Sequence, residues 1–457
     1  MKQRIEKDTL GEIKVNEDKL WGAQTQRALD NFVIGDVLMP VEIIKGIAIT
    51  KKAAAFANCD LGSLTESKKS LIAQCCDEII ADKLDDHFPL KIWQTGSGTQ
   101  TNMNVNEVIA NRANIIVNGV ISESNTVLSP NDDVNKSQST NDVFPTAIRI
   151  AVAKIILEKT IPAIEDFIST ISNKVKEFDT IKKIGRTHLM DATPLTLGEE
   201  FSAYQSQMEH GLESLRNTLP HLMELPIGGT AVGTGLNTPA GYDKLALKYI
   251  NDFTGLHFTN SPNKFESMAS HDSMVETSGA LKRLAVSLMK IANDIRLLSS
   301  GPRCGIGEIT IPANEPGSSI MPGKVNPTQC EALSMVCCQV IGNDVAISTG
   351  AIQGHLQLNV FMPLIGNNLI LSSRLLADAI NSFNRNCMAG IKPNLELISK
   401  HLQNSLMLVT ALNPFIGYYN SAKIAQYAFK NNLTLKQAAI ELNLMTEEEF
   451  DSRMNLL

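Results

Sequence analysis

The amino-acid sequence predicts a mainly all-α protein, with an elongated central helical bundle and smaller N- and C-terminal domains. Aromatic residues make up only 5% of the 457 residues, and Ala, Leu, Ile and Met are frequent. This composition favours helix over sheet. Apolar residues also recur at three- and four-residue spacing, as in amphipathic helices. Five long runs with this spacing are 144–178, 195–223, 271–300, 326–344 and 358–387.

These runs divide the chain into three predicted domains. Residues 1–140 form a mixed, mostly helical domain, 141–392 the long-helix bundle, and 393–457 a small helical domain. Long helices bury their apolar stripes best against one another. A bundle this extended leaves apolar surface on its sides, which favours packing against further copies of the chain.

The two terminal domains show weaker helical patterns. Gly and Pro interrupt the first domain, and little strand is expected in it. Its helical runs are 40–59 and 67–80, and those of the last domain are 404–412 and 421–442, before the charged segment 446–453.

Charge and cysteine usage exclude several classes of protein. The formal net charge of −7 gives no support to a nucleic-acid or anionic-membrane partner. No apolar run approaching a membrane span is apparent, and the first residues lack an apolar signal core, so a cytoplasmic protein is expected. The eight cysteines are too few for a disulfide scaffold and are expected to be reduced core residues. No Cys-x-x-Cys or His-Glu-x-x-His occurs, so a zinc or iron–sulfur enzyme is not expected.

A loop at 315–327 carries the most informative polar residues. Two Gly and three Pro in thirteen residues exclude a regular element. Ser318, Ser319, Lys324 and Asn326 supply hydroxyl, ammonium and amide groups, which suit a carboxylate or phosphate ligand. The loop is not a Walker A motif, because five residues separate its two Gly and Val325 follows the Lys. It also lacks the Gly-x-Ser-x-Gly pattern of a serine nucleophile. An ordinary surface turn is the alternative.

Four further polar segments interrupt the helical pattern, and each taken alone has a structural explanation. They are 94–104, 130–142, 185–194 and 228–237. The first suits helix caps at Thr101 or Asn102, and the second suits capping of the helix that follows. The third places His188 just before a helix expected to begin near Pro194. The fourth suits a flexible connection.

Together, these segments resemble the fumarase/aspartase superfamily. Residues 317–327, Gly-Ser-Ser-Ile-Met-Pro-Gly-Lys-Val-Asn-Pro, are similar to its signature, and the other segments match in order over nearly the whole chain. His188 and Gly323 are similar to the residues of class II fumarases, whereas aspartases typically carry Gln and Ala at these two positions. Segments 354–359 and 412–417 are more similar to the aspartase sequence pattern. The residues nearest the chemistry favour the fumarase branch.

The resemblance implies a lyase that reversibly adds water to fumarate with anti geometry, giving (S)-malate through an aci-carboxylate intermediate. Ser318 is then the base at carbon, and Lys324 stabilises the intermediate with Asn326 and nearby amides. His188, polarised by Glu331, handles the water. The implied substrate-binding residues are Ser97, Gly98, Thr99, Ser139, Thr140, Asn141, Thr187, Ser319, Lys324, Val325 and Asn326. The partner implied is a small dicarboxylate, and the assembly a homotetramer with shared active sites and no required cofactor.

One departure from the fumarase pattern concerns a second dicarboxylate site. Such fumarases often build it partly from Arg and His just before Pro-Asn-Asp, where this chain has Thr126 and Ser129. Asn131 and Asp132 remain, so a weak or absent second site is predicted. Two other functions stay open, namely an aspartate ammonia-lyase and a non-catalytic structural relative.

Overall fold

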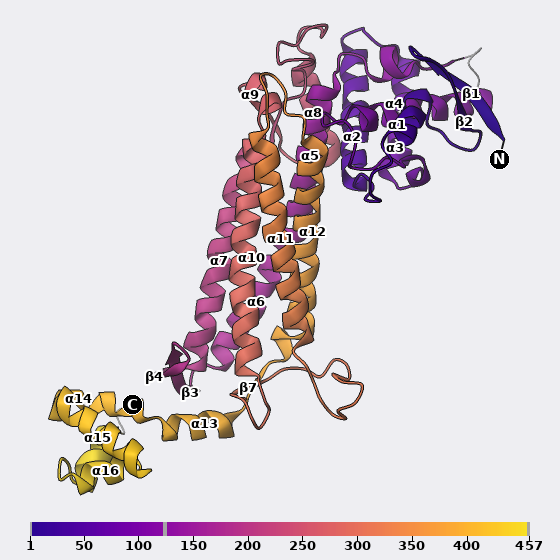
Figure 1. Ribbon diagram of the computed structural model, residues 1–457. Helices are drawn as coiled ribbons and strands as arrows, with labels where there is room; N and C mark the ends of the chain where they lie inside the picture. The colour runs from indigo at the N-terminus through magenta and orange to yellow at the C-terminus, as the bar shows by residue number, and fades with distance from the viewer. Residues whose placement is uncertain (1, 122–125, 455–457) are drawn as a thin grey trace. The chain divides into compact units, whose positions relative to one another are not determined.

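The computed structural model describes residues 2–121 and 126–454 and divides into two compact units (Figure 1). Unit 1 comprises the described residues of Met1–Ala163, Gly211–Val286 and Val336–Asp378. Unit 2 comprises those of Ile164–His210, Ser287–Met335 and Ala379–Leu457. The three predicted domains remain a prediction. Residues 1, 122–125 and 455–457, which fall in the first and third of them, lie outside the described part.

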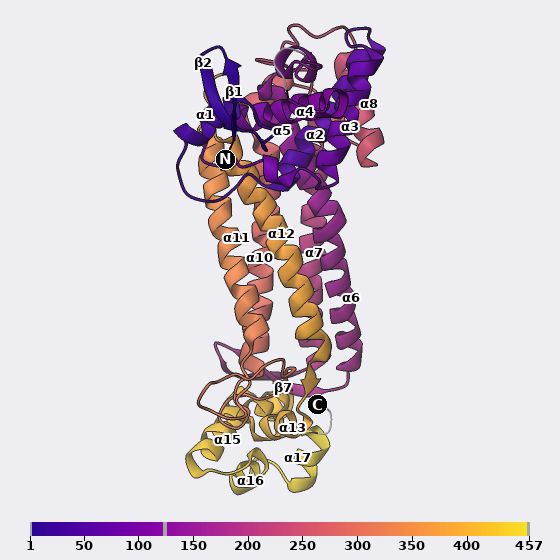
Figure 2. The ribbon, with the colours of Figure 1, turned by 90° about the vertical axis from the view of Figure 1, so that its right-hand side faces the viewer.

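The predicted mainly α-helical fold is confirmed. Five long helices contain the unit boundaries: α6 (Ile161–Glu177), α7 (Leu197–Leu222), α10 (Asp272–Leu298), α11 (Thr328–Ile352) and α12 (Met362–Asn386). Within each unit, the segments of α7, α10, α11 and α12 run side by side (Figures 1 and 2). Each of the five predicted runs is mostly helical. Residues 195–196 and 358–361 precede the helices, which begin at Leu197 and Met362, and α11 continues beyond its predicted end at 344 to Ile352. A π-helical turn, η4 (Ile156–Thr160), joins α5 (Thr140–Ile155) to α6 inside the first run.

The shorter helices complete the two units. Those wholly in unit 1 are α1 (Ala23–Asn31), α2 (Val41–Asp60), α3 (Glu66–Ile80), α4 (Thr99–Asn118), α5 (Thr140–Ile155), α8 (Tyr242–Thr254) and α9 (Lys264–Ala269). The C-terminal helices of unit 2 are α13 (Leu395–Asn404), η6 (Leu406–Leu412), α14 (Asn413–Ile416), α15 (Tyr418–Asn431), α16 (Leu435–Glu441) and α17 (Glu447–Met454). Their small core contains Val409, Leu412, Ile424, Ala428, Leu435, Ala438, Ala439 and Phe450.

Two antiparallel hairpins were missed by the sequence interpretation. One pairs β1 (Gln3–Asp8) with β2 (Gly11–Asn16), and the other pairs β3 (Lys182–Thr187) with β4 (Met190–Thr196). The helix expected to begin near Pro194 exists but begins three residues later: Pro194 pairs with Ile184 in a strand, and α7 begins at Leu197. Two short pairs, β5 (Glu224–Leu225) with β6 (Thr259–Asn260) and β7 (Ile309–Thr310) with β8 (Lys392–Pro393), add little sheet.

Helix α2 forms the centre of unit 1. Most residues along it are buried, so it is enclosed on most of its sides. A Cβ added at Gly46 would lie 2.4 Å from the carbonyl oxygen of Ala147 on α5, so the two backbones touch at this point. Only glycine permits this approach, and it fixes α5 against α2.

Helix α11 corrects the expectation that no apolar run reaches membrane-span length. Among the described residues it is the one helix that is long and apolar enough to cross a membrane. A single helix of this kind is weak evidence for a membrane span, because core helices have the same composition. Only 33% of its most apolar stretch is buried within the chain. Met335, Val345 and Ile352 are exposed by 68%, 62% and 80%, so α11 offers apolar surface to a partner.

Candidate active site

The first polar segment forms the start of α4. The helix begins at Thr99, with Gly98 as its N-cap at φ 75°. The expectation of caps at Thr101 or Asn102 was wrong, because Thr101 lies inside the helix, where its amide and hydroxyl both donate to Gln94 Oε1. Ser97 is buried, and its hydroxyl lies 2.8 Å from that of Thr99. Two neutral hydroxyls therefore lie beside the first amides of this helix N-terminus.

The second polar segment forms the start of α5. Ser139 is the N-cap in a capping box with Asp142, which accepts from the Ser139 amide at 3.0 Å. The other Asp142 oxygen accepts from the amides of Gly228 at 2.9 Å and Thr230 at 3.0 Å. Burial raises the pKa of Asp142 to about 6, although these amides favour its ionised form. Asp142 thus connects the fourth polar segment to the second by hydrogen bonds. The Ser-x-x-Asp sequence pattern predicts the helix cap but not this connection.

Direct contacts bring the starts of α4 and α5 together. A Cβ added at Gly98 would lie 2.5 Å from the ring of Phe144 on α5. Asn102 Nδ2 on α4 donates to the Thr140 hydroxyl at 3.0 Å. Asn141 Nδ2 on α5 donates to the carbonyl of Ala231 at 2.8 Å. Two helix N-termini with hydroxyl and amide side chains have the chemistry that suits an anion.

In unit 2, His188 lies at the tip of the β3–β4 hairpin. His188 and Leu189 form the turn with φ of 56° and 60°, and both are exposed. Two positive φ angles are the geometry of a tight hairpin turn. Thr187, the last residue of β3, is also exposed. His188 is therefore presented outward on a short, well-defined element.

A buried carboxylate anchors this hairpin. Glu308 is fully buried and accepts from Arg186 Nη2 at 2.6 Å. Lys183 Nζ lies 3.1 Å from its second oxygen, and His401 Nδ1 lies 3.1 Å from its first. Burial acts to raise the pKa of Glu308, but Arg186, Lys183 and His401 outweigh it and hold the pKa below its usual value. No local sequence pattern identifies Glu308 as a site-supporting residue, because Arg186 lies 122 positions away.

The loop at 315–327 folds back on itself. The Gly317 amide donates to the Lys324 carbonyl at 2.8 Å, and Asn326 Nδ2 donates to the Gly317 carbonyl at 2.7 Å. Ser318 Oγ accepts from the amides of Ile320 at 3.2 Å and Met321 at 3.0 Å. Two backbone donors on one hydroxyl oxygen favour its deprotonated form. Ser319, Lys324 and Val325 are exposed, and Ser318 and Asn326 are half-buried.

His188 and Glu331 are both exposed. Over residues 2–121 and 126–454 no hydrogen bond or ion pair connects their side chains, so their pairing stays a prediction. In the same part of the chain, no group of three or more His, Cys, Asp and Glu residues is placed to hold a metal ion. Five of the eight cysteines are buried, whereas Cys59 is half-buried and Cys304 and Cys338 are exposed.

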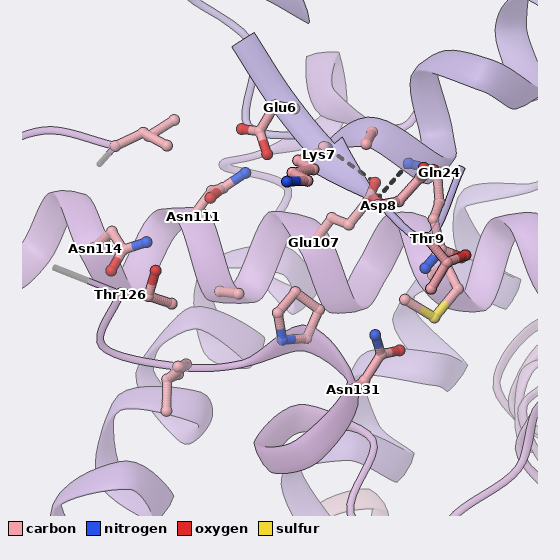
Figure 3. Close-up of a pocket in the computed structure, with 17 residues that line it drawn as sticks. Glu6, Lys7, Asp8, Thr9, Gln24, Glu107, Asn111, Asn114, Thr126 and Asn131 are labelled. Atoms are coloured by element: carbon pink, nitrogen blue, oxygen red, sulfur yellow. Dashed lines mark hydrogen bonds between the residues drawn. The ribbon is translucent and has the colours of Figure 1, made fainter. Parts of the chain in front are cut away.

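The residues expected at a second dicarboxylate site lie beside an acidic pocket. Asn131 and Thr126 line a pocket of about 540 Å³ together with Glu6, Asp8, Glu107 and one cationic residue, Lys7 (Figure 3). The pocket lining includes neither 97–99 nor 139–141. Its acidic side chains oppose a dianion.

Ser129 and Asp132 do not line this pocket. The Ser129 hydroxyl accepts from the Asp132 amide and donates to its carboxylate, both at 3.1 Å. Their polar groups are therefore engaged with each other in the turn that opens η3 (Pro130–Val134).

The contact between α4 and α5 is testable at Gly98. We expect Gly98→Ala to lower the free energy of unfolding by about 3 kcal/mol, combining left-handed backbone strain with the clash at Phe144. Gly119, at the other end of α4, has the same φ of 75° with nothing within 4 Å, so Gly119→Ala should cost only about 1 kcal/mol. Urea unfolding of both variants measures the difference. Equal losses would show that the close contact does not hold the two helices.

Comparisons with known proteins agree with this architecture. Residues 11–342 match the lyase family, and residues 408–457 match the family described as fumarase C C-terminus. The class II fumarate hydratase of Pasteurella multocida (strain Pm70) is 62% identical over 449 residues, covering 98% of this chain and 97% of that protein. The class II fumarate hydratase of Haemophilus ducreyi (strain 35000HP / ATCC 700724) is 62% identical over 452 residues, covering 99% and 97%.

Solved structures give the same result. The crystal structure of recombinant class II fumarase from Schistosoma mansoni has a TM-score of 0.97 at 43% identity, covering 99% of this chain and 98% of that one. A fumarate lyase:delta crystallin from Brucella melitensis, bound to cobalt, has a TM-score of 0.94 at 41% identity, with coverage of 99% and 98%. The chain therefore belongs to the class II fumarate hydratase family of the fumarase/aspartase superfamily.

Proposed function

We propose that the protein is a fumarate hydratase, which reversibly adds water to fumarate with anti geometry to give (S)-malate. The observation that carries the proposal is the junction of the α4 and α5 N-termini, fastened by the bond from Asn102 to Thr140. Helix N-termini and neutral hydroxyls suit a small dicarboxylate, because they bind its charge without holding the product too tightly.

The loop residues supply the chemistry at carbon. When malate is dehydrated to fumarate, the Ser318 alkoxide removes the proton from the carbon beside a carboxylate, leaving an aci-carboxylate. Two backbone amides already donate to Ser318 Oγ, which supports a role as an anionic base. Lys324 and Asn326 stabilise the charge that develops on the substrate. His188, polarised by Glu331, protonates the departing hydroxyl, which leaves as water.

The remaining site residues orient the substrate. Ser97, Thr99 and Thr140 offer hydroxyls, while Gly98 lets α4 approach α5. The other residues proposed to contact the dicarboxylate are Ser139, Asn141, Thr187, Ser319, Val325 and Asn326. We also propose that the second site, made of Ser129, Asn131 and Asp132, binds dicarboxylates weakly or not at all, because acidic side chains line the adjoining pocket.

We further propose a cytoplasmic homotetramer whose copies share active sites. Unit 1 carries 97–99 and 139–141, whereas unit 2 carries 187–188 and 318–331, so neither unit holds the whole set. The exposed apolar residues of α11 support close packing between copies, since such surface is costly to leave in water.

Turnover with alternative substrates tests the reaction. Purified protein given malate without added metal should produce the ultraviolet absorbance of fumarate, and aspartate should produce none. Ser318→Ala should lower kcat by about a thousandfold or more, because it removes the base, whereas Ser319→Ala should retain more activity. Fumarate release from aspartate alone would identify an ammonia-lyase. Absence of turnover with either substrate, in folded protein, would indicate a non-catalytic relative.

Mixing two inactive variants tests shared sites. His188→Asn and Ser318→Ala proteins should each be inactive, yet refolding them together should restore about a quarter of the wild-type activity if the two residues of one site come from different copies. Refolding each variant alone is the control. Mixed assemblies with no restored activity would show that both residues belong to the same copy.

A further inference from the structure

A fully buried lysine lies beneath the junction of α4 and α5. Lys51, on α2, has no exposed surface, and its Nζ donates to Asn135 Oδ1 at 2.7 Å. In the described part of the chain it forms no ion pair with a carboxylate. Burying a charge without a paired countercharge is costly, so a compensating role is expected where such a residue is kept.

A chain of hydrogen bonds connects Lys51 to the proposed substrate site. Asn135 Oδ1 also accepts from Asn102 Nδ2 and Asn106 Nδ2, both at 3.2 Å. Asn102 Nδ2 in turn donates to Thr140 Oγ1. Because the Thr140 oxygen accepts this bond, its own proton is available to a ligand. Lys51 and Asn102 both donate to Asn135 Oδ1, so this oxygen connects them and orients the Asn102 amide, which in turn leaves the Thr140 hydroxyl free to donate to an anion.

We infer that Lys51 is a positioning residue that supplies a buried positive charge to the dicarboxylate site and, through Asn135 and Asn102, directs the Thr140 hydroxyl toward the substrate. The inference rests on the proposed function of this site. The bound dianion adds a second negative charge to that of Asp142 near Lys51, and the network between Lys51 and the site keeps the amine from contacting the substrate directly.

The protonation of Lys51 gives this role a pH dependence. Burial lowers the pKa of Lys51 to about 7. Asp142 on α5 and Cys76 on α3 act in the opposite direction and raise the pKa of Lys51, but burial has the larger effect. Burial raises the pKa of Cys76 well above its usual value, so it stays neutral, and Asp142 ionises above about pH 6. A bound dianion stabilises the protonated amine. Binding should then take up a proton near neutral pH, and affinity should fall as the pH rises above the pKa of Lys51.

Calorimetric binding of succinate, an unreactive dicarboxylate, tests the inference. For the wild-type protein we expect proton uptake in buffers of different ionisation enthalpy and weaker binding at about pH 8 than at about pH 6. Lys51→Met should bind about tenfold more weakly at the lower pH, without uptake due to this residue. Lys51→Arg should keep the affinity but lose the pH dependence, because a guanidinium stays charged. Lys51→Met should also raise KM for malate about tenfold while kcat changes less than about twofold.

Two controls assign the effect. Uptake that persists in His188→Asn excludes that histidine as its source, and thermal unfolding shows whether each variant is folded. If the wild type converts malate but shows no uptake, and all three proteins bind succinate alike, the role of Lys51 is wrong and the proposed function stands. If the wild type neither binds succinate nor converts malate, both are wrong.

Discussion

The proposed substrate-binding residues of unit 1 depend on the hydrogen bonds that the Asp142 carboxylate accepts. It accepts hydrogen bonds from the backbone amides of Ser139, Gly228 and Thr230. One buried group therefore caps α5 and holds the glycine-rich loop at 228–237. A buried acceptor left without these donors would carry a large desolvation cost, and the donors without it would be unpaired. The start of α5 is consequently rigid before any substrate arrives. Preorganisation of this kind lets helix amides and hydroxyls stabilise charge without rearranging.

The two units support their functional residues by opposite electrostatic means. In unit 1, neutral hydroxyls and amides form the proposed substrate site, and a buried cation, Lys51, donates to Asn135 beneath it. In unit 2, cationic side chains converge on the buried carboxylate of Glu308, and their function is to hold the hairpin that carries His188. In both units the buried charged residues therefore support the proposed site residues, while neutral or exposed groups are the ones proposed to contact the substrate.

The sequence was sufficient for the long helices and insufficient for the contacts between them. Helical spacing repeats over many turns, so runs such as 271–300 were predicted nearly to their ends. The β3–β4 hairpin was missed because its turn uses His188 and Leu189 at positive φ instead of glycine, and because Pro194 is also a common first residue of a helix. The polar segments were found because they interrupt the helical pattern. The hydrogen bonds that hold these segments together were not predicted, since Asp142 and Gly228 lie 86 residues apart and no local pattern indicates that pairing.

The most direct measurement is a crystal structure of the protein with succinate bound. If two helix N-termini form the dianion site, one succinate carboxylate should lie within hydrogen-bonding distance of the Thr99 and Thr140 hydroxyls and the first amides of α4 and α5. Succinate bound only elsewhere, for example in the pocket beside Glu6, Asp8 and Glu107, with those hydroxyls and amides unoccupied, would contradict the account.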